Sequence, residues 1–289
     1  MSSTNFNGVL NIYKPKGITS HGVVSRVRRI AGMKKVGHTG TLDPNAEGVL
    51  PICLGKATRL CDTLMAHNKK YRAVLMLGLT TDTQDIWGNV LKESPVELSR
   101  HEIQDAIYSF KGTISQIPPM YSAIKKDGRK LYELARQGVE IEREARRIEI
   151  FDIQIIDIVD NRATFDVECS KGTYIRTLCH DIGEKLKCGG CMADLIRLKT
   201  GDFDAEDSVT LEELEEFGVE KFLIPADKFF QEYTPIHLNE LQEQRVRNGV
   251  SVETDVIQGN YRVYSKNGEF LAIAENINGK LKLTKTFYS

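Results

Sequence analysis

Long apolar runs are missing from this sequence, and cysteine is scarce. No hydrophobic stretch approaches the roughly 18 residues that a membrane-spanning helix needs, and residues 1–7 are short and polar, unlike a signal peptide. The six cysteines are scattered along a chain with no export signal, a setting in which a disulfide framework is rarely found. We therefore expect a cytoplasmic protein that has no membrane partner.

Metal-binding patterns are nearly absent as well. Cys188 and Cys191 have the spacing of a metal or redox pair, but a structural zinc site needs four ligands, and no second Cys or His pair stands at a matching interval. We interpret the two cysteines as small residues of a Gly-rich turn. The sequence predicts no metal and no cofactor.

Net charge is also small. The chain of 289 residues has 39 Lys and Arg against 40 Asp and Glu, a formal net charge of −1, whereas indiscriminate nucleic-acid binding needs an excess of positive charge. The charges are unevenly distributed, because acidic residues gather between 206 and 220 and leave the first two thirds of the chain relatively basic. A basic face on a nearly neutral protein is therefore compatible with this composition.

A carboxylate does stand out, because it lies in a loop of backbone-permissive residues, 36–51. Gly37, Gly40 and Gly48 allow positive φ or a close approach to a ligand, and Asp43 precedes a proline in a turn-forming pair. Such a loop keeps its shape while it exposes side chains. An ionised Asp43 in this setting can act as a nucleophile, a general base or an electrostatic partner. The ordinary alternative is an aspartate that only closes a turn.

The hydrophobic pattern changes repeatedly between the periods of strands and of helices. Thr19 or Ser20 is placed to begin a helix that ends at Gly32, and Ser99 with Glu102 has the spacing of a capping box. Strands are expected at 8–13, 49–54, 71–79, 148–158 and 163–169.

Short strands and turns dominate from about residue 233 onward. Three pairs of Asn and Gly are hairpin signals, at 248–249, 259–260 and 267–268. The sequence therefore predicts a compact β-rich unit at the C-terminus.

Several motifs stand in order along the first two thirds of the chain. They read Gly-His-Thr-Gly-Thr-Leu-Asp-Pro at 37–44, Lys-x-Tyr at 69–71, Thr-Asp-Thr-x-Asp at 81–85, Gly-Thr-Tyr-Ile-Arg-x-Leu at 172–178 and Ala-Asp-Leu-Ile-Arg-Leu-Lys-Thr-Gly at 193–201. Together they resemble the signatures of the bacterial tRNA pseudouridine-55 synthases, the TruB family.

This resemblance implies an α+β fold of the pseudouridine synthase type. Residues 1–232 would form a mixed, mostly antiparallel central sheet with flanking helices, and residues 233–289 a small β-rich, PUA-like RNA-binding domain. A basic segment with two prolines, about 115–147, corresponds to the family's RNA-gripping insertion. The implied reaction isomerises the uridine at position 55, in the T-loop of tRNA, to pseudouridine. The partner would be the T-arm stem-loop, and we expect a monomer with no obligate protein partner.

The resemblance also implies roles for individual residues. Asp43 would be the nucleophile that attacks either the base or the ribose, and Arg176 would keep it ionised through a charge-assisted bond. Tyr71 would line the active site and relay a proton, although the residues alone favour a strand aromatic packed in the core. The side chains that would replace the stacking of a flipped-out uridine, or line its pocket, are His38, Tyr71, Tyr174 and Leu195.

Basic side chains on both sides of the Asp43 loop are candidates for contacts with the RNA backbone, the alternative being ordinary solvated charge. They are Lys14, Arg26, Arg28, Arg29, Lys125, Lys126 and Arg129. Two other functions stay open: a catalytically silent tRNA-binding or RNA-folding protein, and a hydrolase that uses Asp43 as its nucleophile. The hydrolase would need an oxyanion or metal system that the sequence does not reveal.

Overall fold

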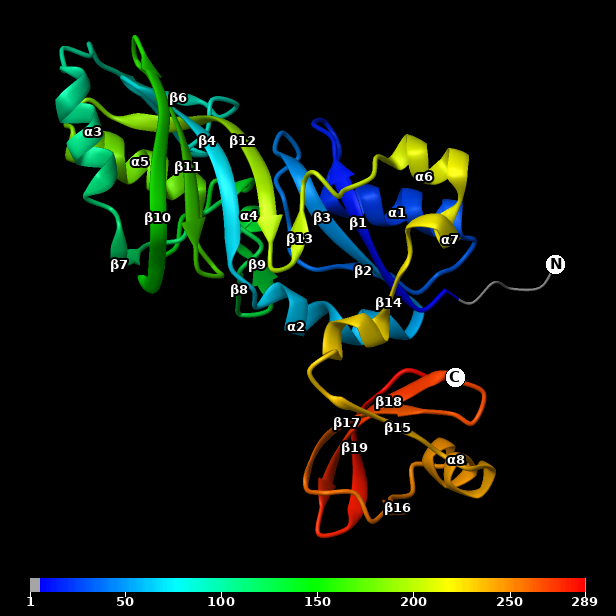
Figure 1. Cartoon of the computed structure of the whole chain (residues 1–289). Coiled ribbons are helices and arrows are strands. Elements are labelled where there is room, and N and C mark those ends of the chain that lie inside the picture. The colour runs from blue at the N-terminus through cyan, green and yellow to red at the C-terminus, as the bar shows by residue number, and fades with distance from the viewer. Residues whose placement is uncertain (1–5, 289) are drawn as a thin grey trace.

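A computed structural model describes residues 6–288, so most of the polar segment 1–7 lies outside the described residues. The chain builds a large sheet covered by helices and, beneath it in Figure 1, a smaller sheet formed by the C-terminal residues. The strands of the large sheet are β1 (Gly8–Lys14), β2 (Val36–His38), β3 (Glu47–Leu54), β4 (Lys69–Leu77), β7 (Gly112–Gln116), β10 (Arg146–Val159), β11 (Arg162–Cys169), β12 (Gly190–Thr200), β13 (Phe203–Asp204) and β14 (Ile224–Pro225).

Helices and short hairpins connect these strands. The helices are α1 (Ser20–Ala31), α2 (Cys61–Met65), α3 (Arg100–Tyr108), α4 (Leu131–Ala135), α5 (Ile175–Lys185), α6 (Leu211–Phe217), α7 (Val219–Phe222) and α8 (Glu240–Arg247), with 3-10 turns η1 (Gly55–Leu60) and η2 (Ala226–Phe230). Two separate hairpins are β5 (Leu79–Thr81) with β6 (Val90–Glu93), and β8 (Lys125–Lys126) with β9 (Arg129–Lys130).

The large sheet is mixed and mostly antiparallel, as expected from the sequence. Its strand order is β14-β1-β3-β12-β4-β11-β10-β7, with β2 added beside β3 and β13 beside β12. Strands β3 and β12 run parallel, and the other neighbours run antiparallel. The β3–β12 pairing brings the Asp43 loop, which precedes β3, next to the sequence motif at 193–201, most of which lies on β12.

That parallel pairing depends on a glycine. Gly48 has a φ of 105°, and a Cβ atom there would lie 2.2 Å from the carbonyl oxygen of Arg197 on β12. A side chain at position 48 would push β3 and β12 apart, because heavy atoms cannot approach so closely. Gly48 therefore keeps the loop of Asp43 against β12.

Alternation of side chains explains how the sheet is covered. Along β4, every second residue from Lys69 to Leu77 is buried, and the residues between them are partly exposed. Helices α3 and α5 bury their apolar faces against β4, β10 and β11, whereas α1 and α6 cover β1 and β3. The site described below lies where these two covered regions meet, at β3 and β12.

The predicted caps of helices α1 and α3 are confirmed. The Thr19 hydroxyl accepts from the Gly22 N–H at 2.9 Å and α1 ends at Gly32 in the left-handed conformation, while Ser99 and Glu102 form the predicted capping box of α3. These interactions join residues close in sequence, so they depend little on the rest of the fold.

The C-terminal sheet consists of β15 (Thr234–His237), β16 (Val252–Glu253), β17 (Gly259–Tyr264), β18 (Phe270–Ile277) and β19 (Lys280–Thr286), in the order β15-β17-β18-β19-β16. Ile273 of β18 and Phe287, which follows β19, share an apolar cluster with Leu60, Leu64 and Phe230 of the larger part. The two parts are therefore joined by packing as well as by the chain.

One hairpin prediction in this region was correct and two were wrong. The pair at 267–268 does join β17 to β18, but Asn248 and Gly249 end helix α8, and Gly259 and Asn260 begin β17. Gly249 has a φ of 74°, which a helix end and a hairpin turn require alike. The pair therefore marks a chain reversal without specifying its kind.

Candidate active site

Asp43 lies in the loop between β2 and β3, and a buried lysine binds the backbone of that loop from the protein interior. Lys14 is completely buried, and its ammonium group donates to the carbonyl oxygens of Pro15 at 2.9 Å, Pro44 at 3.0 Å and Ala46 at 2.5 Å. Burial lowers the pKa of Lys14 to about 8, although Asp43 and Glu47 act in the opposite direction. The structure thus corrects the expectation that Lys14 contacts the RNA backbone, because its buried ammonium group already binds three backbone carbonyl groups.

The lowered pKa of Lys14 predicts a pH-dependent stability. The unfolded chain holds this proton more tightly, so the free energy of unfolding should rise as pH increases from the folded pKa of about 8 towards 10.5, the usual pKa of a lysine. Between about pH 7 and pH 9.5 the wild type should gain about 2 kcal/mol relative to Lys14→Met. Urea unfolding of both proteins at the two pH values measures the difference. Burial also lowers the pKa of Lys69 to about 8, but Lys69 is present in both proteins, so its contribution to the difference cancels. Equal pH dependence in the two proteins would contradict the burial of a charged Lys14.

A buried arginine holds the two ends of the same loop. Arg197 is 2% exposed, and it donates from Nη2 to the Gly40 carbonyl at 3.2 Å and from Nε to the Val49 carbonyl at 2.7 Å. It lies opposite Tyr71 in the pairing of β12 with β4. The sequence motif contained Arg197, but its role was missed, since a cation that binds carbonyl groups inside a protein looks the same in sequence as one on the surface.

Asp43 and Arg176 face each other across the site. Arg176 Nε lies 2.9 Å from Asp43 Oδ2, and Nη2 lies 3.5 Å from Oδ1. The guanidinium also donates to the carbonyl oxygens of Thr83 at 3.0 Å and Tyr121 at 2.7 Å. Arg176 is 6% exposed, whereas the Asp43 side chain is 38% exposed. The carboxylate is therefore open to a substrate, while backbone carbonyl groups from two other segments of the chain hold its cation in place.

A second carboxylate, which the sequence reading did not single out, belongs to the same cluster. Asp85 Oδ2 lies 3.8 Å from Arg176 Nη1, and Asp85 Oδ1 accepts from the Thr83 hydroxyl at 2.7 Å. Burial raises the pKa of Asp85, against the effects of Thr83 and Arg176. The Thr-Asp-Thr-x-Asp motif was the signal that could have identified it.

Tyr71 and Leu195 occupy neighbouring positions on the paired strands β4 and β12. Tyr71 is 8% exposed, and Leu195, 6% exposed, pairs with Ala73 two residues further along β4. Burial raises the pKa of Tyr71, with Arg197 opposing it by charge and by a hydrogen bond. Tyr71 is therefore a neutral phenol near pH 7, able to donate a proton and unable to act as a phenolate base.

Tyr174 and His38 stand at the ends of elements. The Tyr174 backbone begins α5 and is held by Gln116, whose amide group accepts from its N–H at 2.8 Å and donates to its carbonyl at 3.1 Å. His38 ends β2, and its Nδ1 accepts from the Gly40 N–H at 3.2 Å. Burial, with the charge of Arg197, lowers the pKa of His38, so the imidazole is neutral near pH 7.

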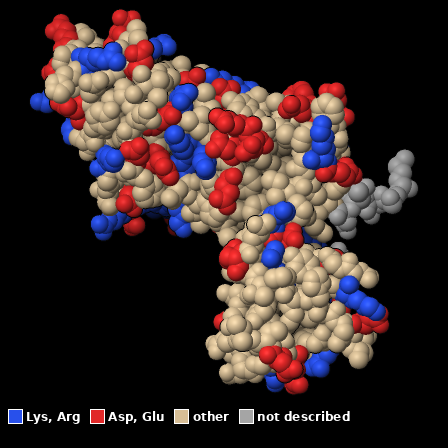
Figure 2. Space-filling model, viewed as in Figure 1, with Lys and Arg blue, Asp and Glu red and all other residues tan. Residues whose placement is uncertain are grey.

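The structure separates the remaining predicted RNA contacts into two groups. Arg26 is already paired, with Glu212 at 2.8 Å and Glu215 at 3.1 Å, and Arg28 donates to the Val36 carbonyl at 3.0 Å. Those exposed to solvent are Arg29, Lys125, Lys126 and Arg129. On the face seen in Figure 2, Lys and Arg are interspersed with Asp and Glu over the larger part, and the C-terminal part is mostly uncharged.

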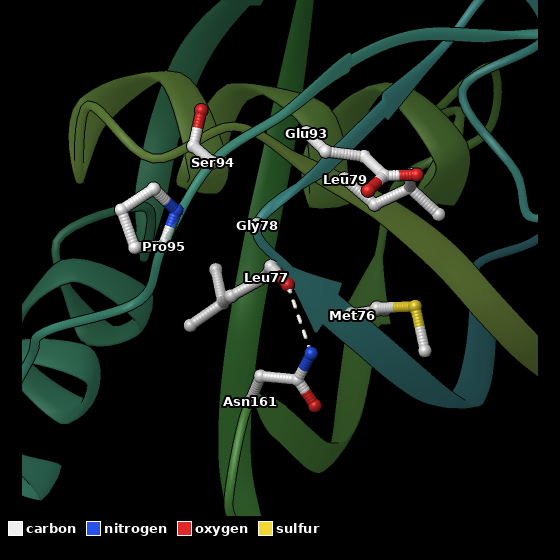
Figure 3. Close-up of a pocket in the computed structure, with 8 residues that line it drawn as sticks. All are labelled: Met76, Leu77, Gly78, Leu79, Glu93, Ser94, Pro95 and Asn161. Carbon is white, nitrogen blue, oxygen red and sulfur yellow. Dashed lines mark hydrogen bonds between the residues drawn. The ribbon is translucent and has the colours of Figure 1, made fainter.

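A surface hollow of about 610 Å³, drawn in Figure 3, is lined by none of the residues of this cluster. Leu77, at its wall, is six residues along β4 from Tyr71, a separation of about 20 Å in a strand. The hollow offers one carboxylate, one serine hydroxyl and no basic side chain; its lining residues are Met76, Leu77, Gly78, Leu79, Glu93, Ser94, Pro95 and Asn161. We therefore assign the chemistry to the Asp43 cluster.

Neither a metal cluster nor a membrane span is found within residues 6–288. No group of three or more His, Cys, Asp and Glu side chains there is arranged to hold a metal ion, and no helix in that range is long and apolar enough to cross a membrane. Cys188 and Cys191 are both buried free thiols.

Comparison with known sequences points to one family. Residues 28–175 match the model "TruB family pseudouridylate synthase (N terminal domain)", and residues 176–231 match "tRNA pseudouridylate synthase B C-terminal domain". The tRNA pseudouridine synthase B of Clostridium perfringens (strain SM101 / Type A) is 50% identical over 288 residues, covering 96% of this chain and 98% of that protein. That of Alkaliphilus oremlandii (strain OhILAs) is 54% identical over 244 residues, covering 84% and 82%.

Solved structures with the same fold come from larger assemblies. A chain of a Cbf5-Nop10-Gar1 complex superposes with a TM-score of 0.69 at 26% identity, covering 97% of this chain and 85% of that one. A chain of an H/ACA RNP bound to a substrate RNA containing 2'-deoxyuridine gives a TM-score of 0.68 at 24% identity, with coverages of 98% and 85%. The likeness extends over nearly the whole length, including the C-terminal β-rich part.

Proposed function

Because the chain belongs to the TruB family of tRNA pseudouridine synthases and is thus an isomerase, we propose that it modifies the uridine at position 55, in the T-loop of tRNA, with Asp43 as its nucleophile. The observation that carries this assignment is the contact of 2.9 Å between Asp43 and Arg176. An exposed carboxylate with a buried cation behind it suits attack on a substrate that enters from solvent.

The reaction needs a nucleophile and proton transfers, and its atoms balance within the substrate. The bond between N1 of uracil and C1′ of ribose breaks, the base turns, and a bond from C5 to C1′ forms; C5 loses a proton and N1 gains one. Asp43 would form a transient bond with the base or the ribose and be released at the end. Tyr71, neutral because burial raises its pKa, would pass a proton between these positions.

Entry of the uridine requires that it leave the stacked T-loop, which costs a few kcal/mol. Tyr71 and Tyr174 would offer aromatic surfaces to the everted base, and Leu195 would contact its edge. His38, at the entrance and neutral near pH 7, would occupy the space that the base leaves. The segment of about 115–147 contacts the site through the Tyr121 carbonyl, which binds Arg176, so closure of this segment on RNA would also position the Asp43 partner.

The remaining parts of the proposal concern domains and partners. We assign residues 1–232 to catalysis and residues 233–289 to a PUA-like RNA-binding domain; the change from η2 to β15 lies near this boundary. The tRNA T-arm would be the partner, bound through the exposed Arg29, Lys125, Lys126 and Arg129. We propose a monomer that works in the cytoplasm, where tRNA is available.

Mapping of the product tests the position. After incubation with an unmodified tRNA transcript, we expect pseudouridine at position 55 and at no other uridine, because the bound T-arm would present to Asp43 only the base everted from its loop. A transcript with cytidine at position 55 serves as the control and should stay unmodified. Modification elsewhere would contradict the assigned position, and binding of tRNA without any modification would favour the silent RNA-binding alternative.

A further inference from the structure

Trp87 is the only tryptophan of the chain, and nearly half of its surface is exposed to solvent. It lies in the turn between β5 and β6, whose backbone is fixed. The Trp87 N–H donates to Asp85 Oδ1 at 3.2 Å, and the Ile86 N–H donates to the Met192 carbonyl on β12 at 3.0 Å. The indole is therefore presented on a rigid support.

The same turn forms part of the wall of the candidate active site. Arg176 donates to the Thr83 carbonyl at 3.0 Å, and its guanidinium lies 3.8 Å from the carboxylate of Asp85. The carboxylate of Asp85, which lies near Arg176, thus also accepts a hydrogen bond from the backbone N–H of Trp87. Asp85 and Arg176 therefore connect the backbone of Trp87 to Asp43 through three consecutive contacts.

The ring has no partner within the part of the chain that the structure describes. No aromatic ring stacks on it and no cation lies over it between residues 6 and 288, and its indole N–H makes no hydrogen bond there. Ile86, Val90 and Leu91 are also exposed, and successive side chains of a strand point to opposite faces. Trp87 is the one aromatic ring among them, so the hairpin offers a single aromatic surface for stacking.

We propose that Trp87 is a stacking platform for a nucleobase that neighbours the target uridine in the bound tRNA. Eversion of the uridine removes a stacking surface from its neighbours in the loop, and an exposed indole beside the cleft replaces that surface. Stacking on an aromatic side chain tolerates any base, so the platform would strengthen binding without reading sequence. The proposal rests on the proposed function, since it needs tRNA in this cleft.

The lone tryptophan allows a direct test. Full-length Asp43→Asn protein, which should bind RNA without turnover, is titrated with an unmodified T-arm stem-loop while its tryptophan fluorescence is recorded. We expect quenching that saturates together with binding measured on filters. Stem-loops with an abasic residue on one or the other side of the target should identify the base, because one of them would bind without quenching. Heparin, a polyanion without bases, should leave the emission unchanged.

Affinity provides the second measurement. Trp87→Ala should weaken binding of the stem-loop by about 5-fold to 100-fold, and Trp87→Phe by less. Tyr108, equally exposed at 47%, lies on α3 at the edge of the sheet beyond β10 (Figure 1) and gives the matched control, Tyr108→Ala, with unchanged affinity. Thermal melting of each variant verifies its fold.

The results separate this proposal from the one on which it rests. Pseudouridine formed by the wild type, with no quenching on binding and no loss of affinity in Trp87→Ala, would overturn the platform alone. Equal losses in Trp87→Ala and Tyr108→Ala would overturn it too. A wild-type protein that neither binds nor modifies the RNA would overturn the proposed function.

Discussion

Replacing Asp43 by asparagine is expected to abolish pseudouridine formation, lowering the single-turnover rate by at least about 10⁴-fold. The amide has the same shape and can still accept a hydrogen bond from Arg176 Nε, which lies 2.9 Å from Asp43 Oδ2. It cannot act as a nucleophile at neutral pH. Release of tritium from uridine labelled at C5 measures the rate, because the isomerisation removes the proton from that carbon.

The binding of tRNA provides the control for this variant. The affinity measured on filters should stay within about two-fold of the wild type, since one exposed side chain contributes little to a large, charge-driven interface. Pseudouridine formation by the asparagine variant at more than a trace of the wild-type rate would reject Asp43 as the nucleophile. Loss of both binding and activity would instead indicate that the loop had been disturbed, which melting curves would reveal.

Interactions between near neighbours in the chain were predictable from sequence. The capping of α1 and α3, the strands and the alternation along β4 follow from patterns of a few residues. Helix α8 was missed because it is almost wholly polar, with Val246 as its buried residue. Without an apolar face, its sequence has no helical period to detect, and its Asn-Gly end was taken for a hairpin.

Site residues could be predicted from the sequence only where they belong to one of the family motifs. The partnership of Asp43 with Arg176 spans 133 residues, and it was expected from the order of family signatures, since no local physical rule joins such distant side chains. The support beneath Asp43 was not expected. Lys14 and Arg197 bind carbonyl groups of the loop after the fold has excluded water from them, and burial of a cation is a property of the tertiary structure.

These supports explain how an exposed aspartate is kept in one position. Loop carbonyls at Gly40, Pro44 and Ala46 point inward to two buried cations, so the side chain of Asp43 is turned outward, towards Arg176 and solvent. Groups held in place before the substrate arrives need no rearrangement during the reaction. The site is therefore rigid at Asp43, and the 115–147 segment reaches it through the Tyr121 carbonyl, which binds Arg176.

Arg176→Lys should reduce the single-turnover rate by about 100-fold to 1000-fold while tRNA affinity is unchanged. Lysine keeps the positive charge but, as a single ammonium group, cannot contact Asp43, the Thr83 carbonyl and the Tyr121 carbonyl together. A lost charge-assisted bond costs about 1.5–3 kcal/mol, and two such losses at the lower end, about 1.5–2 kcal/mol each, account for the expected range. The same tritium-release assay measures it.

The chain contains a matched control for this substitution. Arg72 on β4 forms a forked pair with Asp166, with distances of 2.8 and 3.0 Å, and its side chain lies on the face opposite to that of Tyr71. Arg72→Lys therefore breaks an equivalent ion pair outside the site and should leave the rate of isomerisation within about two-fold of the wild type. Equal losses of rate in both lysine variants would mean that Arg176 acts only through the stability of the fold. A loss confined to Arg176→Lys, with binding intact, ties the rate to the geometry of the guanidinium around Asp43.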